Sequence, residues 1–161
     1  MSQEPPPELP PTTISIGLLT RVVVLLVAIW DAFAGLVLVA FHGASAGALG
    51  AGVEDEAGQR LLGVHLLILV PAYLLLAWKP QENRGFQWLP YAGQLGFTVV
   101  VGYNLLTGDT SFGDGILAFA VGLIFVVLLG FLWVTDQRTQ ARLKMEAQDL
   151  QEQQRPAEGD V

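Results

Sequence analysis

Residues Gly17 to Phe41 read GLLTRVVVLLVAIWDAFAGLVLVAF, an apolar run with one carboxylate, Asp31, near its middle. About 20 mostly apolar residues are enough for a helix to cross the hydrocarbon core of a bilayer. This stretch therefore predicts a membrane-spanning helix and places the chain among the integral membrane proteins. A carboxylate at the centre of such a helix costs roughly 2.5–3.5 kcal/mol on insertion scales, so Asp31 requires an explanation.

The composition agrees with this class. Of the 161 residues, 52% are hydrophobic and 14% are charged, and the hydrophobic residues are collected in blocks. The net charge is −7, but the acidic residues gather in the termini and the first loop, so this charge describes those segments. No basic face is available to neutralise phosphates, so we expect no nucleic acid as a partner. The chain has no cysteine, which excludes disulfides and thiolate chemistry.

Apolar runs recur along the chain and predict four spans. The predicted spans cover residues 17–41, 60–78, 86–106 and 115–134. A helix satisfies its own backbone hydrogen bonds in lipid, and short connections favour antiparallel neighbours. We therefore predict an all-α protein, an integral membrane four-helix bundle whose transmembrane domain covers residues 17–135.

Polar segments flank this predicted domain. Residues 1–16 begin with MSQEPPPELPPTT, and this proline content predicts a disordered tail. A signal peptide is the alternative, because the letters ASA at 44–46 resemble a cleavage site, although the apolar run is longer than a signal core. Residues 136–161 combine charge with strong helix formers, so we predict a cytoplasmic charged helix and tail.

The flanking charges predict the orientation, because basic residues accumulate in cytoplasmic segments of membrane proteins. Most basic residues fall on one side of the four-span order, namely Arg21, Lys79, Arg84, Arg138, Arg142 and Lys144. The other side has Arg60. Trp78, Trp88 and Trp133 fall on the more basic side, where indole rings anchor helices at the interface. Both termini are therefore predicted to be cytoplasmic.

Polar residues inside the spans are candidates for a site. At about 1.5 Å per residue, Asp31, Pro71 and Gln94 come to similar depths near the midplane, on three different helices. Three interpretations of Asp31 stay open. As a neutral acid bonded to Gln94, or to the Leu67 carbonyl released by Pro71, it would only fix the helix register. Otherwise it would titrate or bind a solute in a cavity, or contact another subunit.

His65 and Asn104 come out nearer the outer surface. With His42 as a second ligand, His65 offers a haem or metal interpretation, since imidazole is a usual axial ligand. The alternative is a histidine hydrogen-bonded inside the bundle. Asn104, like Tyr103 before it, is interpreted first as an interfacial or loop-capping residue. The candidate ligand-binding or polar-core residues are therefore Asp31, His65, Gln94 and Asn104, with no catalytic or metal-ligating residue assigned.

Four features of the layout bear on family: Arg21 at the start of the first span, Gly35 within it, a longer first outer loop, and RLLG at 60–63 opening the second span. With these features the layout resembles the DoxX-like group of small bacterial four-helix membrane proteins. The likeness covers residues 17–134. It implies a bacterial plasma-membrane protein and, for some members of the group, redox or quinone-linked accessory roles. This chain departs from a redox member in lacking cysteine, so no functional residue is carried over.

No metalloprotease H-E-x-x-H motif and no Walker phosphate-binding loop is present. Because little of the chain lies outside the predicted spans, we expect a non-catalytic accessory or structural subunit of a larger membrane assembly. The helix at 115–134, where Ala118 and Gly122 form a small-residue packing face, and the C-terminal helix would contact the partner. The alternative is a membrane protein that binds a small lipophilic ligand such as a quinone, or conducts protons, in a polar pocket between the first three helices. No cofactor follows from the sequence.

Overall fold

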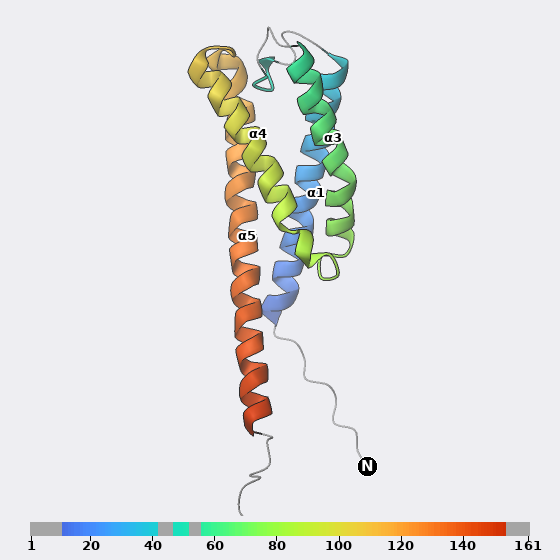
Figure 1. The fold of residues 1–161 in the computed structure, drawn as a ribbon, viewed down its shortest axis with the longest axis vertical. Coiled ribbons are helices and arrows are strands. Elements are labelled where there is room, and N and C mark those ends of the chain that lie inside the picture. Colours follow the sequence, from blue (N-terminus) through green and yellow to red (C-terminus); the bar gives the residue numbers. More distant parts are fainter. Residues whose placement is uncertain (1–10, 42–46, 52–55, 154–161) are drawn as a thin grey trace, which may run out of the picture.

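A computed structural model of the chain describes residues 11–41, 47–51 and 56–153. Within these residues the chain forms long helices joined by short connections, and no strand occurs among them. The elements are α1 (Pro11–Ala40), α3 (Glu56–Trp78), the 3-10 helix η1 (Arg84–Phe86), α4 (Trp88–Thr107) and α5 (Phe112–Gln153), shown in Figure 1. The all-α prediction is confirmed.

The largest differences between the helix bounds and the predicted spans lie at the start of α1 and at the end of α5. Helix α1 begins at Pro11, six residues before the first predicted span. Proline is tolerated in a first helical turn because the N–H that it lacks has no partner there. Residues 1–10 of the predicted N-terminal tail lie outside the described residues. At the other end of the chain, α5 continues through the predicted boundary at Thr135 as one helix.

Three helical segments are long and apolar enough to cross a membrane. They are Gly17–Ala40 in α1, Glu56–Trp78 as the whole of α3, and Phe112–Leu150 in α5. This length and composition are those of a multi-pass membrane protein. Helix α4, which is 20 residues long and contains Gln94 and Asn104, is not among these three segments.

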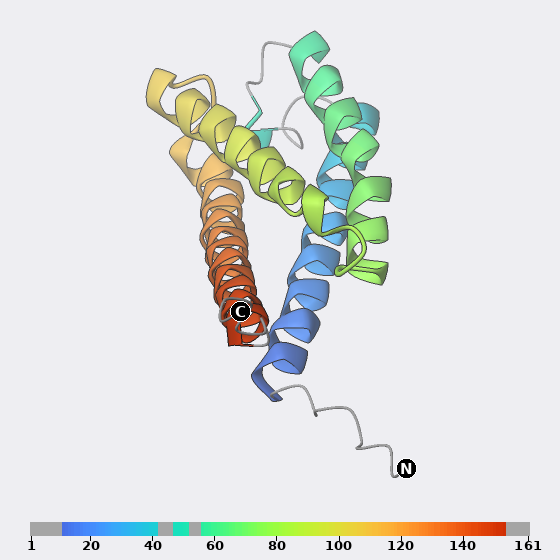
Figure 2. The ribbon, with the colours of Figure 1, turned by 60° about the horizontal axis from the view of Figure 1, so that its bottom comes forward.

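The long helices lie side by side as two pairs. Contacts are most extensive between α1 and α3 and between α4 and α5, and they are fewer between α1 and α5 and between α3 and α4. Figure 2 shows α4 running obliquely from the start of α5 towards the end of α3. The first helical turn of α1 and the last of α5 lie at the same end of the molecule (Figure 1).

Helices α1 and α3 come closest at two glycines. A Cβ atom at Gly63 would lie 2.8 Å from the carbonyl oxygen of Gly35, and one at Gly35 would lie 2.9 Å from the carbonyl oxygen of Gly63. Real side chains do not fit at these distances, so glycine at both positions lets the two backbones touch. Gly35 and Gly63 therefore set the spacing of this pair.

Small residues also bring α5 close to α4. Ala118 is 1% exposed, and a Cβ atom at Gly122 would press on the hydroxyl of Thr98. The small-residue face predicted from the sequence is thus a packing face within the chain. Larger apolar side chains of α5, such as Ile124 and Phe131, point outward instead.

The interior contains two apolar clusters, one towards each end of the helices. The cluster nearer the projecting part of α5 includes Val24, Val27, Tyr73, Leu76 and Leu129. The other includes Ala34, Leu38, Leu66, Phe97 and Val101. Along α1, Asp31 lies between the residues of the two clusters, so a polar layer separates them.

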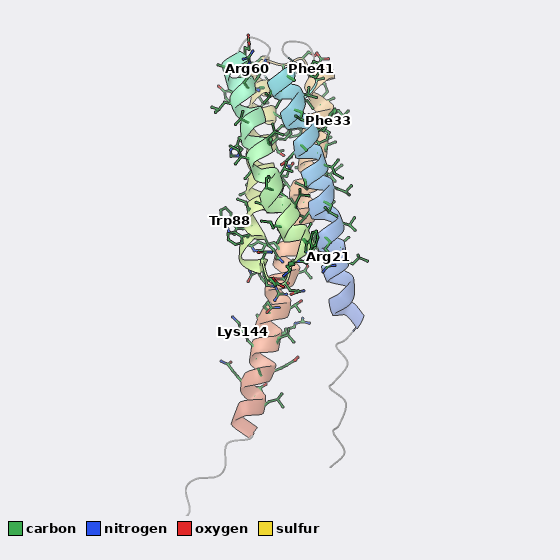
Figure 3. The ribbon with its side chains drawn as sticks, turned by 90° about the vertical axis from the view of Figure 1, so that its right-hand side faces the viewer. Arg21, Phe33, Phe41, Arg60, Trp88 and Lys144 are labelled. Carbon is green, nitrogen blue, oxygen red and sulfur yellow. The ribbon has the colours of Figure 1, made fainter. Side chains whose placement is uncertain are left out.

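Charged residues mark the two ends of the molecule (Figure 3). Arg21 and Lys144 lie towards the end from which α5 projects, whereas Arg60 and Phe41 lie at the opposite end. The structure thus places the start of α1 and the end of α5 at the end of the molecule that carries Arg21 and Lys144.

Candidate functional site

The structure brings Asp31 of α1 and Gln94 of α4 together in the interior. Both side chains are 0% exposed, and Nε2 of Gln94 donates a hydrogen bond of 2.5 Å to Oδ1 of Asp31. The hydroxyl of Thr98 donates to the backbone carbonyl of Gln94 at 2.7 Å, so it is satisfied within its own helix. A direct side-chain contact therefore links two helices that belong to different pairs.

Helical spacing explains why Asp31 and Gln94 face each other. The buried residues of α1 recur every three or four positions, at Val24, Val27, Asp31, Ala34 and Leu38. The same spacing on α4 connects Pro90, Gln94, Phe97 and Val101. Residues at these intervals share one face of an α-helix. The polar pair thus occupies the inward stripe of each helix.

Tyr73 of α3 adjoins this pair, although the sequence analysis did not select it. Its side chain is 0% exposed, and its hydroxyl packs on the backbone at Gly93, the residue before Gln94. The Tyr73 hydroxyl, Asp31 Oδ2 and Gln94 Oε1 are buried without a hydrogen-bond partner in the described part of the chain. A buried polar atom without a partner costs about 1–3 kcal/mol. Oδ2 of Asp31 would therefore gain from a proton, and all three atoms would gain from a water molecule or a polar ligand group.

His65 does not belong to this site. It is exposed on α3, whereas the buried residues of that helix follow the inward stripe through Gly63, Leu66 and Tyr73. The structure therefore does not bring His65 to Asp31 and Gln94, and a binding role for His65 stays a prediction. His42, its proposed companion ligand, lies outside the described residues. Gly63, Leu66 and Tyr73 share one face of α3, and this helical spacing was the signal in the sequence that Tyr73 faces the interior.

Asn104 lies at another level, where it holds the described part of the first loop. Its Nδ2 donates to the carbonyl of Gly50 at 2.8 Å, and the hydroxyl of Thr110 donates to the carbonyl of Ala51 at 3.1 Å. Gly50 has a φ of 76° and packs on Val101, so a side chain there would be strained and crowded. Asn104 thus binds a loop, and it is not close to Asp31.

Two other sequence features bear on chemistry. The letters GASAG at 43–47 fit G-x-S-x-G, a pattern whose serine is nucleophilic when it sits on a turn between a strand and a helix. Residues 42–46 lie outside the described part, and no strand occurs among the described residues, so that context is not seen. Among the described residues, no three His, Asp or Glu side chains gather as a metal site.

Comparisons with known proteins identify no relative. No protein-family model, no curated protein sequence and no solved structure matches this chain. The resemblance to DoxX-like proteins therefore stays a prediction from the layout of the spans. A function must be inferred from the chain's own residues.

Proposed function

We propose that this chain is a non-catalytic accessory or structural subunit of a larger membrane assembly. The observation that carries this proposal is the projecting part of α5. This helix is continuous from Phe112 to Gln153, and every residue from 141 to 150 is exposed (Figure 1). At about 1.5 Å per residue, the part after Thr135 is roughly 27 Å long. The chain's own helices do not bury these side chains, so this part of α5 offers a rigid surface to another polypeptide.

The transmembrane part is proposed to be a four-helix bundle in which α4 is the remaining span. Its 20 residues correspond to about 30 Å, the thickness of the hydrocarbon core. Gln94 and Thr98, which lower its mean hydropathy, are buried against other helices, whereas Leu95 and Val99 are exposed. An apolar outer face supports contact with lipid along α4.

Both termini are proposed to lie in the cytoplasm, in a bacterial plasma membrane. The positive-inside rule supports this orientation, because Arg21 and Lys144 lie towards the end of the molecule from which α5 projects (Figure 3). Exposed indoles of Trp78 and Trp88 fall at this end of α3 and α4 and suit the interfacial belt. The bacterial assignment rests on the resemblance in layout alone.

Native mass spectrometry of the full chain, extracted gently from its own membrane, tests the accessory role. We expect a mass above that of the protomer, with other polypeptides attached. A variant truncated after Gln140 should lose these partners, whereas the variant Asp31→Asn should retain them, because the buried pair does not reach the projecting helix. A wild-type protomer, or a homo-oligomer without other polypeptides, would exclude the accessory role.

A second candidate is a membrane protein that binds a small lipophilic ligand such as a quinone, or conducts protons, between α1, α3 and α4. The unpartnered buried atoms of Asp31, Tyr73 and Gln94 favour it. The variant Asp31→Asn keeps the volume and an acceptor while removing the titrating group. Loss of a bound small molecule or of proton flux in proteoliposomes, with folding intact, would support this candidate. Unchanged ligand binding and unchanged proton flux would show that Asp31 is needed for neither activity.

A further inference from the structure

The hydrogen bond between Gln94 and Asp31 leaves one oxygen of each side chain unused. Nε2 of Gln94 donates to Oδ1 of Asp31 at 2.5 Å, whereas Oδ2 of Asp31 and Oε1 of Gln94 are buried without a partner in the described part of the chain. An ionised carboxylate and an amide oxygen are both acceptors, so neither can satisfy the other. The pair therefore lacks one donor hydrogen, and a buried acceptor without a donor is destabilising.

Neither unused oxygen can take this hydrogen from a water molecule in the packed structure. Each has less than 1 Å² of accessible surface, so water or a ligand would reach it only after the helices move apart. The neighbouring hydroxyls do not supply the hydrogen either. Thr98 donates to the backbone carbonyl of Gln94, and the Tyr73 hydroxyl is itself without a hydrogen-bond partner among the described residues.

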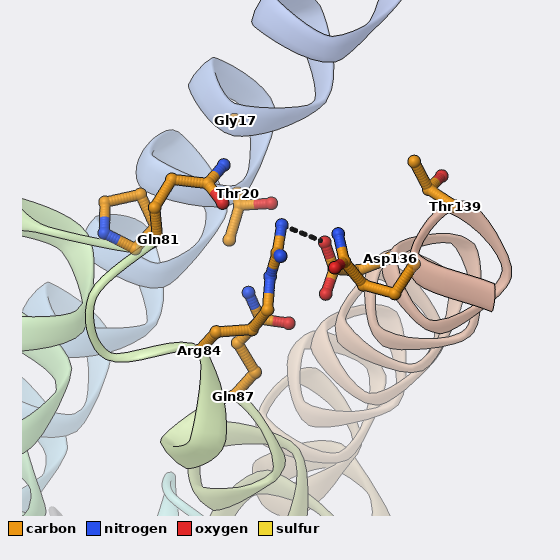
Figure 4. Close-up of a pocket in the computed structure, with 9 residues that line it drawn as sticks. Gly17, Thr20, Gln81, Arg84, Gln87, Asp136 and Thr139 are labelled. Atoms are coloured by element: carbon orange, nitrogen blue, oxygen red, sulfur yellow. Dashed lines mark ion pairs between the residues drawn. The ribbon is translucent and has the colours of Figure 1, made fainter. Parts of the chain in front are cut away.

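Asp31 also lacks a cationic partner, unlike Asp136. Oδ1 of Asp136 in α5 lies 3.0 Å from Nη2 of Arg84 in η1 (Figure 4). Helix α4 and residues 115–134 of α5 contain no charged side chain. In α1 the nearest charged residue is Arg21, about 15 Å from Asp31 along the helix axis. An ionised Asp31 would therefore be a buried charge without a counter-ion, which is strongly unfavourable.

The titratable groups of the helices packed on α1 do not supply a counter-ion. On α3, Glu56 and Arg60 form an ion pair with each other near the start of the helix, and His65 is exposed. Tyr73 is the titratable side chain of α3 that lies beside Gln94. Tyr91 of α4 packs on an aromatic ring of α5 instead. A proton is thus the donor that this pair can hold without a rearrangement of the helices.

We infer that Asp31 is a neutral carboxylic acid whose proton, on Oδ2, is donated to Oε1 of Gln94. A carboxylic acid and a primary amide each present one donor and one acceptor side by side. Two hydrogen bonds then join the same two side chains, and both unused oxygens are satisfied without any added molecule. Since Asp31 belongs to the α1–α3 pair and Gln94 to the α4–α5 pair, one bound proton links the two pairs of helices.

This proton makes the contact between the helix pairs dependent on pH. Its loss would leave a buried carboxylate beside the amide oxygen of Gln94, with one hydrogen bond in place of two. The folded protein should therefore become less stable as the pH rises. The inference rests on the burial of this pair and does not depend on the accessory role of the chain.

Infrared spectroscopy of the full-length protein, at neutral pH and in a detergent without carbonyl groups, tests the protonation of Asp31. Exposed aspartates are ionised at this pH, so the carbonyl band of a carboxylic acid reports a neutral buried acid. We expect this band in the wild type, and it should shift when the aspartate carboxyl groups carry a heavy carbon isotope. Absence of the band, or of the isotope shift, would overturn the proposal.

One pair of variants assigns the band to a residue. Asp31→Asn should abolish the band, whereas Asp109→Asn, at an exposed aspartate, should retain it. A band that survives Asp31→Asn in folded protein would overturn the proposal. If that variant does not fold, the isotope shift in the wild type still decides.

A second pair of variants tests the bond to Gln94. Gln94→Leu removes both the acceptor of the proton and the donor to Oδ1, so the band should move to higher frequency. Thr98→Val is the matched control on α4, because the Thr98 hydroxyl bonds within its own helix. An unchanged frequency in folded Gln94→Leu would show that Gln94 does not share the proton and would overturn the proposal.

The pH dependence of stability gives an independent measurement. Above about pH 5, where exposed carboxylates have ionised, the folded protein should hold one more proton than the unfolded chain. The unfolding equilibrium constant of the wild type, divided by that of Asp31→Asn, should therefore rise about tenfold per pH unit until Asp31 ionises in the folded protein. The variant cannot lose this proton and keeps every other titrating group. Parallel pH profiles of the two proteins would overturn the proposal.

Discussion

Gln94 donates a hydrogen bond of 2.5 Å to Asp31, and this bond joins α4 to α1 where both side chains are fully buried. Polar contacts also link separate elements towards either end of the helices. Asn104 binds the first loop through Gly50 at one end, and Arg84 binds Asp136 of α5 at the other. Since the two helix pairs share fewer contacts than the helices within each pair, these polar contacts hold the pairs in register.

Removal of the Asp31 acceptor should destabilise the protein. Asp31→Ala leaves Nε2 of Gln94 buried without its partner, so the free energy of unfolding should fall by about 1–3 kcal/mol. Asp31→Asn keeps an acceptor oxygen and a similar volume, so the loss should be below about 1 kcal/mol. Reversible unfolding in mixed micelles measures both. Equal losses for the two variants would show that the hydrogen bond does not matter.

A double-mutant cycle isolates the contact between these two side chains. Gln94→Leu is combined with Asp31→Ala, and the free energies of unfolding of the single and double variants are compared. Hydrogen bonds between membrane helices couple by about 0.6–1.7 kcal/mol, and we expect a coupling energy in that range. A coupling energy near zero would show that the contact between Asp31 and Gln94 does not stabilise the protein.

Alanine at Gly63 should weaken the packing of α1 on α3. Its Cβ atom would lie 2.8 Å from the carbonyl oxygen of Gly35, and forcing extra atoms into a packed site costs about 1–3 kcal/mol. Gly96→Ala is the matched control, because a Cβ atom there meets nothing within 4 Å and alanine favours the helix. The melting temperature in detergent should fall for Gly63→Ala and stay level or rise for Gly96→Ala. The reverse order would contradict the close approach of the two backbones.

Loss of the Asn104 side chain should loosen the first loop. Because the chain has no cysteine, Leu49→Cys provides a unique label at a residue that is 6% exposed. Adding Asn104→Ala removes the bond to Gly50, and a loss of about 1 kcal/mol should speed maleimide labelling about fivefold. Thr107→Ala is the control, because Thr107 bonds within its own turn and to Asp109. Equal rates in all three proteins would exclude a role for Asn104 in holding the loop.

The four-span topology predicts which residues react from outside the cell. Single cysteines at Glu56, Glu82, Asp109 and Lys144 are treated with a membrane-impermeant maleimide. The variants at Glu56 and Asp109 should react in intact cells, and those at Glu82 and Lys144 only after lysis. If α4 does not span, Glu82 and Asp109 will react alike, because both ends of α4 will lie on one side. That result would contradict the fourth span.

The rise and the periodicity of an α-helix predict the features that depend on residues close together in the sequence. The common depth of Asp31 and Gln94 could be foreseen because the helical rise per residue is constant, and their burial agrees with a three-to-four residue spacing. A proline-rich composition by itself does not locate the start of α1 at Pro11, because proline is also tolerated in a first helical turn. His65 is polar but lies off the inward stripe of α3, so polarity alone does not predict which residues meet in the interior.

The sequence by itself determined the class of the protein, since apolar runs of sufficient length must form helices that satisfy their own hydrogen bonds in lipid. It also determined the asymmetry of charge between the two ends. Only the tertiary structure decided that Tyr73 packs at Gly93 beside Gln94, that Gly35 meets Gly63, and that Arg84 pairs with Asp136. These relationships depend on how each helix is rotated about its axis and on which helices are neighbours. Packing across the whole chain sets both, and no local stretch contains that information.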